Sequence, residues 1–234
     1  MEIPVIDFGM LETEKRSETM ALHHQACQKW GFFMIENHGV EKELMEKLKL
    51  LTKMHYEENM KDSFFNSETA KSLDNNGYIS KTDWESTFFI SHRPNSNINH
   101  LTTLSQDLRK TMEEYIDQLI KLAEKLSELM CENLGIEKNH IIEAFSGSKG
   151  PSVGTKVAMY PHCPRPELIR GLREHTDAGG IVLLLKTTKS ALHRVMAMKD
   201  GDRLSIATFY NPSGDAIISP ASELLLPSHV RFQD

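Results

Sequence analysis

The sequence changes character between residues 135 and 150. Before that point most segments favour helix, and the two clearest predicted helices cover about 42–60 and 105–133. Gly135 follows the second of these, at a position where glycine commonly ends a helix. After Gly150, short apolar runs alternate with Pro and Gly clusters, which is typical of strands and turns. No low-complexity linker or internal repeat separates the two parts, so the sequence predicts one α+β domain with helices packed on a β core.

Apolar periodicity supports these elements. The helix predicted over 105–133 carries an apolar stripe at alternating spacings of four and three: Leu108, Met112, Tyr115, Leu119, Leu122, Leu126 and Leu129. Short strands are predicted over residues 3–8, 153–160, 168–175, 181–186, 191–198 and 203–210. Residues 62–103 are polar and weakly periodic apart from the stretch 84–89, and no element is assigned there.

The charge and cysteine content narrow the possible functions. With 33 acidic and 27 basic side chains and no basic cluster, the chain is a poor candidate for binding nucleic acid or an anionic membrane, and a small-molecule substrate is expected. Cys27, Cys131 and Cys163 form no C-x-x-C pair, which argues against a disulfide framework and against a cysteine-based zinc site. The sequence shows neither a signal-peptide pattern nor an apolar stretch of membrane-spanning length, so a cytoplasmic protein is expected.

The strongest chemical signal is His175-Thr176-Asp177, at the end of the strand predicted over 168–175. Residues i and i+2 of a strand project to the same side, so the imidazole and the carboxylate can reach one metal ion. Two histidines and one carboxylate on one face of Fe(II) leave open positions for substrate and dioxygen. His193 is the best-placed second histidine downstream.

A His-x-acid pattern alone is weak evidence in a chain with 11 histidines. A second pair, His55 and Glu57, lies on the helix predicted over 42–60, where residues i and i+2 diverge by about 200°. His55 is therefore interpreted as a packed or surface helix residue rather than a metal ligand.

Ten residues after His193 comes Arg203-Leu204-Ser205. On a strand, Arg203 and Ser205 share one face, and a guanidinium beside a hydroxyl forms a receptor for a carboxylate or bicarbonate. The alternative is a surface arginine on an edge strand.

The order His-x-Asp, His-Arg-Val and Arg-x-Ser resembles the plant Fe(II)/2-oxoglutarate oxygenase superfamily. Residues 3–7 and 30–39 resemble the N-terminal region of that superfamily. The similarity extends from residue 3 to about residue 220, and several stretches resemble the 1-aminocyclopropane-1-carboxylate (ACC) oxidase family specifically: residues 83–89, 131–135, 147–151, 154–157, 160–166, 171–180 and 209–212.

The resemblance implies an α+β fold with a double-stranded β-helix, or jelly-roll, core behind a helical N-terminal region. It divides the chain into four segments: an N-terminal helical region over 3–100, a long helix packing on the core over 101–135, a shortened jelly-roll region over 150–220 and a divergent tail over 221–234.

The resemblance also implies the reaction, which is oxidation of ACC by dioxygen to ethylene, with ascorbate as reductant and bicarbonate as activator and without 2-oxoglutarate. The iron ligands that it implies are His175, Asp177 and His193. The residues matching the family's bicarbonate or ascorbate site are Arg203 and Ser205. The residues matching positions that line the catalytic pocket are Lys156, Tyr160 and Arg173, each of which has a purely structural role as its alternative.

The chain departs from the family between two of these ligands. Asp177 and His193 are only 193 − 177 = 16 positions apart, where the family has several tens of residues. About three strands are therefore expected to be missing from the eight of a jelly roll, leaving strand edges and the inner face of a sheet uncovered and the iron ligands less supported.

Two other functions stay open at this point. One is a 2-oxoglutarate-dependent oxygenase of another small molecule, since such enzymes share the triad and Arg-x-Ser. The other is a non-catalytic shortened relative. The oligomeric state is not predicted.

Overall fold

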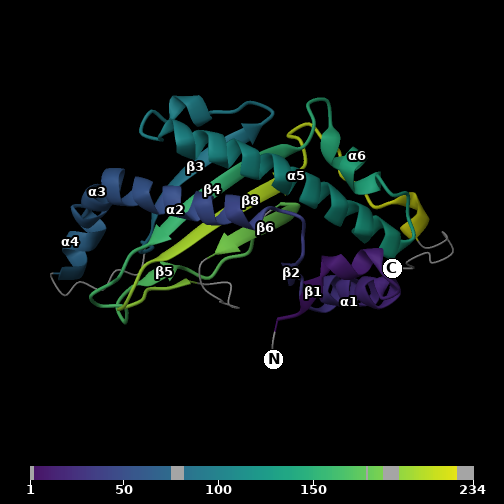
Figure 1. Ribbon diagram of the computed structural model, residues 1–234, viewed down its shortest axis with the longest axis horizontal. Coiled ribbons are helices and arrows are strands. Elements are labelled where there is room, and N and C mark those ends of the chain that lie inside the picture. The colour runs from purple at the N-terminus through teal and green to yellow at the C-terminus, as the bar shows by residue number, and fades with distance from the viewer. Residues whose placement is uncertain (1–2, 75–81, 178, 187–194, 226–234) are drawn as a thin grey trace, which may run out of the picture. The chain divides into compact units, whose positions relative to one another are not determined.

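The computed structural model describes residues 3–74, 82–177, 179–186 and 195–225 (Figure 1). The chain forms two compact units, where the sequence predicted one domain. The first unit comprises residues 1–39, 121–151 and 212–234, and the second comprises residues 40–120 and 152–211. The long helix α5 (Gln106–Leu134) contributes to both, because the boundary between the units falls at residue 120.

The first unit is mainly helical. Its strands β1 (Val5–Asp7) and β2 (Met34–Glu36) pair in parallel, and α1 (Arg16–Lys29) connects them after a short 3-10 helix. The remaining elements of this unit are the 3-10 helices Phe8–Glu12 and Ser222–Leu224, the second part of α5, and α6 (His140–Ser146). An ion pair of 2.7 Å between Arg16 and Glu132 joins α1 to α5.

The second unit contains the β core. A four-stranded antiparallel sheet has the order β3 (Ser86–Arg93), β4 (Ser152–Tyr160), β8 (Arg203–Asn211) and β6 (Ile181–Lys186). A smaller sheet pairs β5 (Arg170–Leu172) with β7 (Val195–Met196). The helical elements of this unit are α2 (Lys42–Asn59), α3 (Lys61–Phe65), α4 (Glu68–Asp74), the 3-10 helix Ile98–His100 and the first part of α5.

One face of the four-stranded sheet is covered by helix. The His55 ring of α2 packs edge-on against Phe88 of β3, with ring centroids 5.3 Å apart, and Figure 1 shows α2 crossing the sheet. The same face carries a buried polar contact, in which the Thr155 and Thr208 hydroxyls lie 3.0 Å apart and His92 Nε2 lies 3.0 Å from Thr155. This helix-covered face holds the apolar side chains that anchor the sheet, including Val157, Leu204 and Ile206.

The opposite face carries four of the predicted site residues, Lys156, Tyr160, Arg203 and Ser205. The register places Tyr160 opposite Arg203 and Ala158 opposite Ser205, so these side chains emerge on the same side of the sheet. The small sheet approaches that side at Gly171 of β5, where an added Cβ would lie 3.1 Å from the Tyr160 ring and 2.8 Å from Val195. Only glycine allows this approach without displacing a neighbour.

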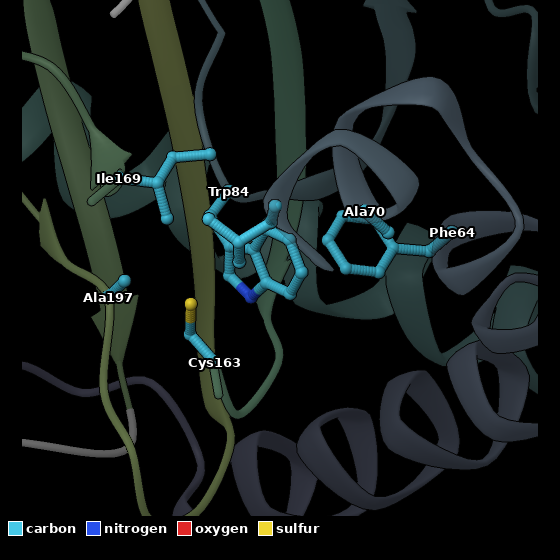
Figure 2. Packing of buried hydrophobic residues seen from close by; sticks show 7 residues of the cluster. Phe64, Ala70, Trp84, Cys163, Ile169 and Ala197 are labelled. Carbon is cyan, nitrogen blue, oxygen red and sulfur yellow. The ribbon is translucent and has the colours of Figure 1, made fainter. Parts of the chain in front are cut away.

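A compact apolar cluster joins α3 and α4 to the loops around the small sheet (Figure 2). Trp84 lies at its centre, 1% exposed, with the Phe64 ring edge-on at 4.9 Å. The Trp84 indole N–H donates to the Pro161 carbonyl at 3.0 Å, and its backbone N–H donates to the Arg170 carbonyl at 2.8 Å. The residues of the cluster are Phe64, Ala70, Leu73, Trp84, Cys163, Ile169 and Ala197.

The predicted long helices agree with α2 and α5 to within one or two residues. The strand predicted over 168–175 is limited to Arg170–Leu172. Of the strand predicted over 191–198, residues 195–198 are described, and only Val195–Met196 form a strand. The prediction missed β3, because its pairing partner β4 lies more than sixty residues away and the segment has little alternation of its own. Within the described part of the chain, none of the helices combines the length and hydropathy that crossing a bilayer requires.

Candidate functional site

The His175 and Asp177 side chains lie together just after β5. His175 Nε2 is 3.4 Å from Asp177 Oδ1, and both side chains are about two-fifths exposed. His175 Nδ1 is 2.9 Å from the Arg173 carbonyl oxygen, which can only accept a hydrogen bond. Nδ1 therefore donates to that carbonyl, and Nε2, which faces the Asp177 carboxylate, is the nitrogen that would bind a metal ion.

The donor set fits a divalent iron ion as far as the structure describes it. A neutral imidazole nitrogen and a carboxylate oxygen are two of the three ligands in a two-histidine, one-carboxylate site. The third predicted ligand, His193, lies outside the described residues. Among the residues that are described, no group of three His, Cys, Asp or Glu side chains could hold a metal ion. Val195, two residues after His193, lies opposite Leu172 of β5, three residues before His175.

The other His-x-acid pair is structural, as predicted. His55 is 6% exposed and packs against Phe88, and its Nδ1 lies 3.3 Å from the Asn59 amide nitrogen. Burial lowers the pKa of His55, so the neutral ring is favoured inside the helix-covered face.

Arg203 and Ser205 of β8 are buried on the site face of the sheet, 8% and 7% exposed. The Arg203 guanidinium carbon lies 5.1 Å from the Tyr160 ring centroid. Arg203 Nε and Nη1 are buried and have no hydrogen-bond partner among the described residues. Burial lowers the pKa of Arg203, and a hydrogen bond with the Tyr160 hydroxyl opposes that shift. Because β8 lies between β4 and β6, the alternative of a surface arginine on an edge strand is wrong.

Glu85 links two of the predicted pocket residues. Lys156 Nζ lies 2.8 and 3.0 Å from the two carboxylate oxygens of Glu85, in a pair whose side chains are one-third exposed or less. Burial and the negative charge of Glu85 raise the pKa of Tyr160, which is also hydrogen-bonded to that carboxylate. The Tyr160 hydroxyl is therefore protonated at neutral pH and lies between an acid and the Arg203 guanidinium.

Arg173 is held by a second carboxylate, that of Asp83. The Arg173 backbone N–H and its side-chain Nε–H donate to the same oxygen, Asp83 Oδ1, at 3.0 and 2.9 Å. The Arg173 side chain is 54% exposed, whereas the Asp83 side chain is 14% exposed.

Sequence reasoning missed Asp83 and Glu85 as functional residues, although they belong to a stretch that resembles the family. Both flank Trp84, whose burial in the apolar cluster fixes the position of the segment. The signal that could have found them is the acid–Trp–acid order itself. Two carboxylates beside an anchored tryptophan require cationic partners, and the chain has Lys156 and Arg173 for this role.

Comparison with known proteins decides the family. Residues 3–108 match a family described as the N-terminal region of a non-haem dioxygenase in morphine synthesis. The chain is 55% identical over 274 residues to 1-aminocyclopropane-1-carboxylate oxidase 1 of Arabidopsis thaliana, with 100% of this chain and 88% of the relative covered. It is 44% identical to 1-aminocyclopropane-1-carboxylate oxidase 2 of Malus domestica, with 95% of this chain and 79% of the relative covered.

The chain belongs to the ACC oxidase family. The resemblance read from the sequence is thereby confirmed, and an Fe(II) oxidoreductase is the enzyme class of this family.

Solved structures agree with the ACC oxidase assignment at the level of fold. The structure of JOX2 in complex with 2OG, Fe and JA matches with a TM-score of 0.76 at 26% identity, over 97% of this chain and 79% of that one. The dioxygenase for auxin oxidation 1 from Arabidopsis thaliana matches with a TM-score of 0.74 at 20% identity, over 98% of this chain and all of that one. These oxygenases have a jelly-roll core, so the predicted fold class is confirmed in its coarse form, a mixed helix and sheet chain of the jelly-roll oxygenase type.

Proposed function

We propose that this member of the ACC oxidase family oxidises ACC to ethylene with dioxygen, using Fe(II) and with ascorbate as reductant. The observation that carries the proposal is the 55% identity to an ACC oxidase along the whole chain. The His175–Asp177 pair, with Nε2 3.4 Å from the carboxylate oxygen, supports the same conclusion from geometry.

The iron would be held by His175, Asp177 and His193. When bound, it supplies a Lewis-acidic, redox-active centre at which the amino acid substrate and dioxygen can be brought together. The chain's own contribution at the described ligands is orientation: the Arg173 carbonyl accepts a hydrogen bond from His175 Nδ1 and so fixes the ring with Nε2 beside the Asp177 carboxylate. The position of Val195 opposite Leu172 supports His193 as the third ligand, since it places the start of β7 near the segment that carries His175.

Arg203 and Ser205 would bind an anionic partner, either the bicarbonate activator or ascorbate. Two buried N–H groups of Arg203 lack partners among the described residues, and Ser205 adds a hydroxyl two residues along the same face. Burying a hydrogen-bond donor without a partner costs free energy, so an anion that accepts hydrogen bonds from these N–H groups binds favourably. Neighbouring Tyr160 would help to hold the guanidinium in place, because its hydroxyl donates to the Glu85 carboxylate and accepts from Arg203.

Lys156 and Arg173 would line the pocket with positive charge whose position is already set. Each has a carboxylate partner, Glu85 and Asp83 respectively, so neither side chain has to be ordered when substrate binds. The roles of Lys156, Tyr160 and Arg173 toward ACC remain predictions, as does the cytoplasmic location.

We also propose that the jelly roll of this chain is shorter than that of its relatives. The described residues form six strands in the two sheets of the second unit, where a jelly roll has eight. The alignment with the Arabidopsis relative spans 274 residues and covers all 234 of this chain, so 274 − 234 = 40 of its positions have no residue here. On the face that carries Lys156, the Phe89 and Leu184 side chains are 51% and 50% exposed, as expected where covering strands are absent.

Headspace ethylene from purified protein with Fe(II), ascorbate, bicarbonate and ACC tests the function. Ethylene is expected from the parent chain and from a His100→Gln control, which changes an exposed histidine away from the site, and not from His175→Gln. Folded protein that binds Mn(II) but releases no ethylene would contradict the proposal. ACC-independent conversion of 2-oxoglutarate to succinate would favour the alternative oxygenase activity instead.

A further inference from the structure

The segment that carries the two described iron ligands has little support from regular structure. Residues 173–177 follow β5, which is only three residues long, and lie outside any strand. The His175 side chain is 40% exposed, so burial alone does not hold the imidazole. Besides its contact with Asp177, the imidazole is held by the hydrogen bond from Nδ1 to the Arg173 carbonyl.

The Arg173 residue is fixed at both its main chain and its side chain by one carboxylate. Asp83 Oδ1 accepts from the Arg173 backbone N–H at 3.0 Å and from Nε at 2.9 Å. Two donors on one carboxylate oxygen constrain the peptide unit as well as the guanidinium, and hydrogen bonds to an ionised group are among the strongest in proteins. The Asp83 side chain is 14% exposed, so solvent competes weakly for it.

Asp83 is in turn anchored through its neighbour. Trp84 is 1% exposed in the apolar cluster (Figure 2) and donates hydrogen bonds to the Pro161 and Arg170 carbonyls. The bond to Arg170 ties the segment to the start of β5, three residues before Arg173. The position of the Asp83 carboxylate is therefore set by the core and not by the loop that it supports.

We propose that Asp83 is a positioning residue for the iron ligand His175, acting through Arg173. The Asp83 carboxylate fixes the Arg173 main chain, and the carbonyl of that residue holds the imidazole in the tautomer and orientation that aim Nε2 at the metal. This inference rests on the proposed iron site. It goes beyond that site because it names a residue, 90 positions before Arg173 in the sequence, on which the orientation of His175 depends.

The position of the proton on the His175 ring can be measured directly in the metal-free protein. Imidazole ¹⁵N resonances of His175, assigned by their loss in His175→Gln, report which ring nitrogen carries the proton. In the parent chain and in an Asp200→Ala control, which removes an exposed aspartate of a loop, the Nδ1–H form is expected. Asp83→Ala is expected to give a mixture of tautomers at the same pH.

Mn(II) affinity, measured by the electron paramagnetic resonance signal of the free ion, is the second readout. Asp83→Ala is expected to weaken binding about tenfold, at the lower end of the roughly 10–100-fold range for residues that orient metal ligands. Asp83→Asn keeps an oxygen that can accept from the Arg173 N–H and should lose less than Asp83→Ala. Should Asp83→Ala fail to fold, Asp83→Glu, which keeps the charge and displaces the carboxylate, takes its place with the same expectation.

The two proposals can fail separately. If the parent chain binds Mn(II) through His175 and folded Asp83→Ala binds it within twofold, with the same tautomer, the positioning role is overturned and the iron site stands. If the parent chain binds no Mn(II), the iron site fails, and an unchanged tautomer in Asp83→Ala then overturns the positioning role as well.

Discussion

Replacing Arg203 by methionine removes the buried guanidinium of β8 while keeping most of the side-chain length. Two of its N–H groups are buried without partners among the described residues, and an unmet buried donor costs about 1–3 kcal/mol. The change also loses the contact with the Tyr160 ring at 5.1 Å, worth about 0.5–2 kcal/mol, and the hydrogen bond to the Tyr160 hydroxyl, worth about 1 kcal/mol. The free energy gained by removing the unpaired buried donors exceeds the free energy lost with the two Tyr160 contacts, so Arg203→Met should stabilise the anion-free protein by about 2 kcal/mol.

Binding of the anion should narrow this difference in stability. In the parent chain, bicarbonate at ten times its dissociation constant adds about 1.4 kcal/mol to the free energy of unfolding. Arg203→Met should gain nothing from bicarbonate, because the donors that bind it are gone. The structure thus predicts a variant that is more stable than the parent without the anion and insensitive to it.

Urea unfolding at 25 °C, in degassed buffer and with added bicarbonate, measures both effects. Arg170→Met, which removes a half-exposed arginine of β5 and its surface ion pair with Glu174, is the control and should change stability by less than about 0.5 kcal/mol. If Arg203→Met is destabilised by more than about 1 kcal/mol in bicarbonate-free buffer, the guanidinium is already satisfied in the free protein. The argument for an anion site on β8 would then be refuted.

Three further outcomes follow from the structure. Glu85→Gln should lower the free energy of unfolding by about 1–3 kcal/mol, since it leaves the partly buried Lys156 ammonium without its charge partner. Combining it with Lys156→Met should recover much of that loss. If urea unfolding shows that the effects of the two single changes add strictly in the double variant, the coupling is excluded. Burial holds the pKa of His92 at about 4, below its ordinary value of 6.5, so its contribution to stability is complete above pH 6.5 and is lost as the pH falls toward 4; between pH 7.5 and pH 5 this is worth about 2 kcal/mol, and His92→Gln should lose that much less stability over the same interval. Leu184→Lys on the uncovered sheet face should reduce binding of the dye ANS without lowering stability by more than about 0.5 kcal/mol. Leu50→Lys, at an exposed position of α2 away from that face, should leave dye binding unchanged. Equal effects of the two would argue against a contiguous apolar surface on that face.

The two long helices and most strands of the core were predictable because their signals are local. The 3.6-residue period of α5 and the short apolar runs of β4, β6 and β8 can each be recognised within a window of some ten residues. The strand β3 was not predictable in the same way. Its place at the edge of the sheet depends on pairing with β4, and on Phe88 meeting a helix that precedes it in the sequence.

The candidate site also has features that short sequence spacings predict and features that depend on the tertiary structure. His175-Thr176-Asp177 could be recognised because a two-residue spacing decides whether both side chains face one ion, and the structure places their donor atoms 3.4 Å apart. Arg203 and Ser205 could be paired for the same reason. Their burial, which separates a buried anion receptor from a surface arginine, depends on β8 having a neighbour on each side.

The amino-acid sequence was sufficient for the family, the fold class and the identity of the candidate ligands, because each of these depends on residue types at short, fixed spacings. The partners of those residues were decided only in three dimensions. Glu85 meets Lys156 across 71 positions and Asp83 meets Arg173 across 90, and no local pattern encodes such distances. The burial of Trp84 between the two acids brings them to their cations, since an indole that packs in the core fixes the direction of the residues on either side.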